Sequence, residues 1–153
     1  MDKEPGASNI EADTRPDYIK NNEVGRGSFE FEGKKYDYTL IDRQIQPNLP
    51  GFLGFVDGKY LFISDEVPEK FREPQLIHEV DEFTNPELVG KPGRCVESLK
   101  REFARIPDDM KEEYIEYRKN FFHKLREFQK NNEGVDEGLK KEIITTDEYL
   151  QSL

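Results

Sequence analysis

Alternating apolar and polar residues predict strands in the first half of the chain. Residues 28–32 alternate with a period of two, and residues 36–42 follow as a return strand after a short turn. A second pair of apolar runs, 52–56 and 60–64, flanks Asp57-Gly58, a dipeptide typical of tight hairpin turns. We therefore expect an antiparallel sheet of about four strands.

The second half of the chain shows helical spacing of its apolar residues. The pattern predicts three main helices over 74–84, 94–106 and 109–131, and two weaker short helices near 137–142 and 147–153. Strands followed by helices indicate an α+β fold in which the three main helices pack on one face of the sheet.

The polar start of the chain differs in composition from the rest. Residues 1–22 contain few apolar side chains, so burial cannot offset the entropy that ordering would cost, and we expect a disordered acidic tail. Residues 23–153 are long enough for a single α+β domain. Residues 46–51, with two prolines and a glycine, predict a loop between the two strand pairs.

Charge and composition exclude several classes of function. The net charge is -10, and no cluster of Lys and Arg stands out, which argues against direct binding of nucleic acid. No apolar run approaches the length of a membrane helix, and no segment reads as a signal peptide. Cys95 is the only cysteine, so no internal disulfide forms. We expect a cytoplasmic protein that binds neither nucleic acid nor membranes.

The candidate chemistry lies in the segment Leu76-Ile77-His78-Glu79-Val80-Asp81-Glu82-Phe83. At about 100° per residue, one side of this helix carries four apolar residues that would pack on the sheet: Leu76, Ile77, Val80 and Phe83. His78 and Glu82 fall together on the opposite side, one turn apart, with Glu79 between the two sides. Two ligands at i and i+4 with an adjacent carboxylate are the spacing that a metal-binding helix needs.

The motif His78-Glu79-x-x-Glu82 and the strand–turn–helix order before it resemble small zincin-type metallopeptidases, including the ImmA/IrrE-like group. In those proteins an edge strand precedes the HExxH helix and lies along the substrate cleft. The resemblance covers about residues 57–106. It implies that His78 is a zinc ligand, that Glu79 is the general base, and that a peptide or protein is the substrate. Glu82 stands where the second histidine of the pattern would be and would replace it as an oxygen ligand.

A third ligand comes from the next helix in the gluzincin variety of this fold. The resemblance therefore points to Glu102, which lies at the edge of the apolar stripe of the predicted helix 94–106, whereas Glu97 points the other way. Cys95 lies on the same edge as Glu102 and is either a further ligand or a small buried side chain. A His/Glu/Glu set accepts Zn²⁺, and also Mn²⁺ or Fe²⁺.

Two alternatives compete with the metal site. His78 and Glu82 can instead form a simple ion pair on a solvated acidic face of the helix. The whole protein can instead be a non-enzymatic interaction protein, of the inhibitor or immunity type, whose acidic surface binds a basic protein partner. His123, the other histidine, falls opposite the apolar stripe of its helix and is expected to be exposed.

Overall fold

The computed structural model describes residues 13–42, 53–130 and 137–153. Within them one four-stranded sheet precedes the main helices, so the fold is α+β, as the sequence predicts. The strands are β2 (Glu23–Phe31), β3 (Lys34–Ile41), β4 (Leu53–Val56) and β5 (Tyr60–Ser64). Their order in the sheet is β2-β3-β5-β4. The loop predicted at 46–51 and the first twelve residues of the predicted tail lie outside the described residues.

The sheet is mixed rather than antiparallel throughout. β2 pairs with β3 and β4 pairs with β5 in antiparallel register, but β3 and β5 run parallel. Local turn signals specify each hairpin, but they do not specify which strand of the second hairpin joins the first. Because β5 takes the inner place, β4 becomes the edge strand of the sheet.

Two tight turns fix the register of the hairpins. Glu32 and Gly33 connect β2 to β3 with φ of 51° and 79°, and Asp57 and Gly58 have φ of 56° and 64°. Positive φ at both central residues is the backbone geometry of turns that match the twist of antiparallel strands. Glycine at the second position of each turn relieves the strain that a side chain would impose there.

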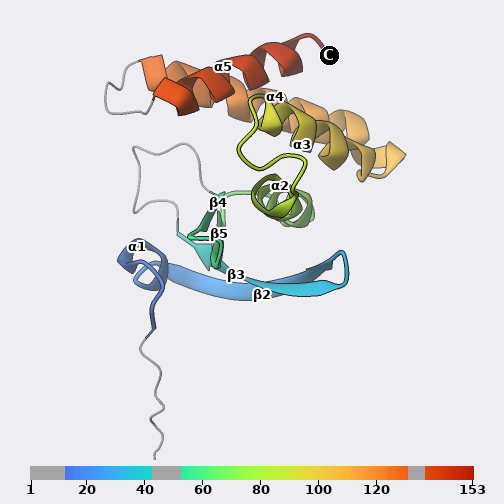
Figure 1. Cartoon of the computed structure of the whole chain (residues 1–153). Coiled ribbons are helices and arrows are strands. Elements are labelled where there is room, and N and C mark those ends of the chain that lie inside the picture. Colours follow the sequence, from blue (N-terminus) through green and yellow to red (C-terminus); the bar gives the residue numbers. More distant parts are fainter. Residues whose placement is uncertain (1–12, 43–52, 131–136) are drawn as a thin grey trace, which may run out of the picture.

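The main helices all lie on one side of the sheet (Figure 1). They are α2 (Arg72–Thr84), which follows a short 3-10 turn η2 (Glu69–Phe71), then α3 (Arg94–Ala104), α4 (Asp108–Lys130) and α5 (Glu137–Gln151). Helix α2 contacts β4 and β5 directly, and α3, α4 and α5 cover α2 as an outer layer (Figure 1). Helix α2 is therefore enclosed between the sheet and the other helices.

Residues 13–22, which the sequence assigns to the tail, belong to the described structure. Residues Asp17–Lys20 form the short helix α1, in which Ile19 is completely buried. The ring of Tyr18 packs edge-on against Phe62 of β5, 5.6 Å between centroids. Tyr18 and Ile19 fix this segment to the sheet. The low apolar content of residues 1–22 as a whole does not reveal these two contacts.

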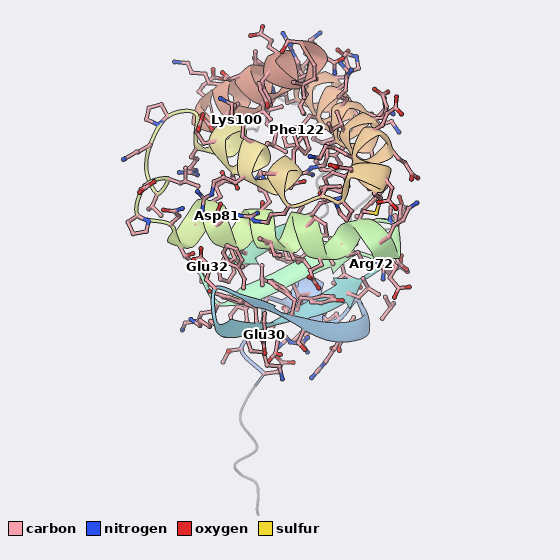
Figure 2. All side chains as sticks on the ribbon, turned by 90° about the vertical axis from the view of Figure 1, so that its right-hand side faces the viewer. Glu30, Glu32, Arg72, Asp81, Lys100 and Phe122 are labelled. Carbon is pink, nitrogen blue, oxygen red and sulfur yellow. The ribbon has the colours of Figure 1, made fainter. Side chains whose placement is uncertain are left out.

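The two faces of the sheet differ in polarity. Phe29 is buried beneath the helices, and its neighbour Glu30 points to the opposite face, away from α2 (Figure 2). The core on the helix side joins buried residues of β2, β5 and all four main helices, among them Leu61, Leu76 and Leu99. None of the described helices combines the length and the apolar character that a membrane span requires.

Helix α5 is continuous, whereas the sequence predicts two short helices at this place. Its β-branched stretch Ile143-Ile144-Thr145-Thr146 has low intrinsic helix propensity. Ile143, Thr146 and Leu150 are nevertheless buried on one face of the helix, which packs on α4. Burial of that face therefore overrides the local preference.

Candidate metal centre

The polar side of α2 is buried, not solvated. His78 is 2% exposed and Glu82 is 8% exposed, because α3 packs across this side of the helix. The exposed ion pair that competes with a metal site in the sequence analysis is therefore contradicted. Phe83, which the helical wheel assigns to the sheet-facing side, is instead 44% exposed at the end of the helix.

Two potential ligand atoms, one from Glu82 and one from Cys95, lie close to a third, the Nε2 nitrogen of His78. The Nε2 atom lies 3.1 Å from Glu82 Oε1 and 3.8 Å from Cys95 Sγ. Ligand atoms of these three residues lie within 4.8 Å of one another, and all three residues are buried. Among the described residues, no other group of His, Cys, Asp and Glu side chains meets this condition. Cys95, the weaker candidate in the sequence, thus belongs to the cluster.

Glu102 approaches the other nitrogen of the same ring. Its Oε1 lies 2.8 Å from His78 Nδ1, at ion-pair distance, although the alignment falls short of a hydrogen bond. The sequence predicts Glu102 as the third metal ligand. The structure brings its carboxylate to His78, but on the side of the ring away from Glu82 and Cys95, and Glu102 is not in the group of three ligand residues. A carboxylate at this place orients the imidazole, as partners of metal-bound histidines commonly do.

Glu102 is itself held by α4. Tyr114 donates its hydroxyl proton to Glu102 Oε2, and the Arg118 guanidinium lies 3.0 Å from Oε2 and 3.2 Å from Oε1. Arg118 is 1% exposed and also donates to Gln75 Oε1 of α2 at 3.3 Å. A chain of buried polar contacts thus runs from α4 through Glu102 to His78.

Sequence reasoning missed Arg118, although its position carries a signal. Tyr114, Arg118 and Phe122 recur at a spacing of four along α4 and are all buried. The apolar stripe predicted for this helix consists of Tyr114, Tyr117, Phe121, Leu125 and Phe128. Of these, Tyr114 is buried and the other four are only partly buried. An arginine between two aromatic residues at helical spacing therefore signals a buried ion pair. His123 is exposed, as predicted.

Electrostatics keep this cluster charged. Burial alone would lower the pKa of His78, but contacts with Cys95, Glu102 and Glu82 outweigh it and raise this pKa well above its ordinary value. Burial alone would raise the pKa of Glu102 and of Glu82, but Arg118 and His78 lower the first, and His78 and Arg94 lower the second. The metal-free site therefore holds an imidazolium cation between two carboxylates.

Glu79 differs from the other carboxylates of the site. It makes no hydrogen bond or ion pair with the residues that the structure describes, and it lies half-buried in the wall of a cavity beside His78. Burial raises the pKa of Glu79 to about 7, with the charges of His78, Glu82 and Glu102 as smaller influences. A carboxyl group with this pKa can both take and release a proton near neutral pH.

The distances from His78 Nε2 to the ligand atoms of Glu82 and Cys95 fit a small divalent cation. Ligands of tetrahedral zinc lie about 2.0–2.3 Å from the ion, which places them roughly 3.3–3.6 Å from one another. The distances of 3.1 Å and 3.8 Å at His78 Nε2 lie close to those values. One nitrogen, one oxygen and one sulfur ligand leave a fourth position open, as in catalytic sites. Sulfur favours Zn²⁺ or Fe²⁺ over Mn²⁺.

A cavity of about 360 Å³ opens beside the cluster. His78, Glu79, Glu82 and Cys95 form one part of its wall. The rest comes mainly from α4 and α5 and combines apolar side chains with polar ones such as Arg118 and Glu142. Leu53, the first residue of the edge strand β4, also lines it. No protein-family model matches the chain, and no curated protein or solved structure matches it either.

Proposed function

We propose that this protein is a zinc-dependent hydrolase of the peptidase type, with the metal held by His78 Nε2, Glu82 and Cys95. The observation that carries the proposal is the placement of Glu79. This carboxylate has no hydrogen-bond or ion-pair partner among the described residues, faces the cavity, and lies next to the one buried group of N, O and S ligands found there.

Each residue has a distinct task in this proposal. A bound Zn²⁺ supplies a Lewis acid and lowers the pKa of a coordinated water toward neutrality. Glu79 accepts a proton at its carboxylate and returns it to the leaving group, for which a pKa of about 7 is suited. Glu102 holds the imidazole of His78 so that Nε2 points toward Glu82 and Cys95.

The edge of the sheet supports a peptide substrate. β4 pairs on one side only within the described sheet, and its first residue, Leu53, lines the cavity beside the cluster. An extended peptide that adds to the free side of β4 would pass the cavity mouth, since unpaired backbone groups of an edge strand are a template for a further strand.

Elemental analysis of protein loaded with zinc and then desalted tests the proposal. We expect about one equivalent of zinc in the wild type and in His123→Ala, which removes the exposed histidine, and none in His78→Ala. Because a buried substitution can unfold the protein, a second measurement uses Co²⁺. The wild-type protein should show a near-ultraviolet thiolate-to-cobalt band that Cys95→Ser removes while circular dichroism is unchanged.

Peptide cleavage is the last measurement. Glu79→Gln should retain the metal but lose hydrolysis of a peptide library, because the ligands remain and the base is gone. Wild-type protein that retains no metal would refute the proposal. The search would then turn to basic protein partners, which the net charge of -10 would attract.

A further inference from the structure

The cavity beside the candidate metal centre is larger than one side chain requires. Its volume of about 360 Å³ equals that of roughly 12 water molecules in the liquid. The volume lies within the range of small-molecule sites, about 300–1,000 Å³.

The lining of the cavity follows α4 from Arg118 to Gln129, and eleven residues of helix span about 16 Å. Between them the lining is mostly apolar: Phe121, Phe122, Leu125 and Phe128 of α4, and Leu139 and Ile143 of α5, beside the polar Glu142 and Thr146 of α5. A mostly apolar lining of this length suits a linear chain better than a compact group.

One end of the cavity is polar. At the Arg118 end lie His78 and its neighbours, because Arg118 pairs with Glu102 and Glu102 contacts His78. At the other end Gln129 is 4% exposed, and its Nε2 donates to Lys140 O at 3.3 Å. Its Oε1 is buried and has no hydrogen-bond partner within the described structure, but a water molecule does not reach this oxygen, so it does not face the cavity. At this end the apolar side chains of the lining, not Gln129, would contact a ligand.

We propose that the cavity binds the linear acyl chain, about eight to ten carbons long, of a substrate whose carbonyl head group lies at the metal end. This inference rests on the proposed function for its head group only. The chain fills the mostly apolar space between α4 and α5. Among peptides and amides, the enzyme would then prefer those that carry such an acyl chain.

Straight-chain hydroxamic acids test the cavity and the metal site separately. Displacement of the fluorescent probe N-phenyl-1-naphthylamine reports their affinity for metal-free and zinc-loaded protein, at concentrations below micelle formation. Affinity should rise by up to about fourfold for each added methylene group, the equivalent of about 0.8 kcal/mol, between acetohydroxamic and decanohydroxamic acid. Zinc should raise the affinity of every acid in the series by a similar factor, because the metal contacts only the hydroxamate head group.

A mouth variant and a matched control place the chain. Leu139→Trp adds bulk at a residue that lines the cavity and is 52% exposed, and Val89→Trp adds the same bulk at a residue that is 49% exposed and is not among the lining residues. We expect Leu139→Trp to weaken decanohydroxamic acid at least tenfold, with acetohydroxamic acid unaffected. Val89→Trp should change neither.

The outcomes separate the two proposals. Equal affinity for short and long chains on zinc-loaded protein would overturn the acyl-chain site and leave the metal centre standing. A steep chain-length series that zinc does not affect would support the acyl-chain site and overturn the proposed function. Equal weakening by Leu139→Trp and Val89→Trp would overturn the placement of the chain in this cavity.

Discussion

Glu79→Gln should make the metal-free protein more stable at pH 8 than the wild type. The substitution keeps the size of the side chain but removes its charge. In the folded protein the pKa of Glu79 rises from 4.5 to about 7, chiefly because the group is buried. A carboxylate at this position is therefore held in an environment that disfavours its ionised form.

The sign of the pH dependence follows from this shift. Between pH 4.5 and about 7 the unfolded chain releases the Glu79 proton while the folded protein retains it. The free energy of unfolding therefore falls as the pH rises through this window, and the contribution is constant above it. A glutamine has no such proton, so the variant lacks this part of the dependence.

The size of the effect is limited by the cavity. One pKa unit corresponds to about 1.4 kcal/mol, so the full shift would amount to roughly 3 kcal/mol. Glu79 is half-buried at a cavity wall that admits water, which screens part of the penalty. We therefore expect a relative gain for the variant of about 1–2 kcal/mol between pH 5 and pH 8.

Urea unfolding at pH 5, 6, 7 and 8 in the presence of a chelator measures this difference. Far-ultraviolet circular dichroism is the suitable signal, because the chain contains no tryptophan. Glu97→Gln provides the control, since Glu97 has an exposed carboxylate whose one ion-pair partner among the described residues is Lys100 on its own helix. If the wild type and Glu79→Gln show parallel profiles over this range, Glu79 is not the desolvated carboxylate on which the proposed base depends.

Three further substitutions test the surroundings of the site by chemical denaturation. Arg118→Met should lower the free energy of unfolding by about 3–5 kcal/mol, because it leaves the buried carboxylate of Glu102 without its guanidinium partner; a loss below 1 kcal/mol would contradict this. Asp81→Asn should destabilise the protein above pH 5 and much less below pH 3. Burial would raise the pKa of Asp81, but Arg101 and Asn85 outweigh it and lower this pKa, so the ionised carboxylate stabilises the fold. A pH-independent loss of stability would show that the charge of Asp81 does not stabilise the fold. Gly27→Ala should cost about 1–3 kcal/mol, since a Cβ atom there would lie 2.4 Å from the Tyr38 ring, and a neutral result would show that the ring moves aside freely.

Local patterns predicted the elements better than their arrangement. Asp57-Gly58 placed the β4–β5 hairpin correctly, because a tight turn depends on the two residues that form it. The parallel pairing of β3 with β5 depends on which strand of that hairpin meets the first one, and no residue of either strand encodes this alone. The continuity of α5 likewise depends on its packing against α4.

In the candidate site, too, contacts within one helix were predictable from the sequence and contacts between helices were not. The i,i+4 spacing predicted that His78 and Glu82 lie together, and they do, because spacing on one helix is a local property. Their burial depends on the packing of α3 against α2, which the sequence pattern of α2 alone cannot predict. The approach of Glu102 to Nδ1 rather than Nε2 depends on Arg118, which lies on a third helix.

The charged cluster is difficult to explain as a device for stability. Apolar residues make up only 34% of this chain, and buried ion pairs seldom stabilise a protein more than apolar side chains of similar size. A triple variant, His78→Leu, Glu102→Leu and Arg118→Met, should therefore unfold with a free energy equal to the wild type or higher by about 1–4 kcal/mol. Each single substitution should instead be destabilising, because it leaves a charge unpaired, and the triple variant should retain no zinc. If the triple variant is markedly less stable than the wild type, the cluster is needed for the fold. If it is as stable, the fold does not require the cluster, and the proposed cation site then accounts for the cluster better than stability does.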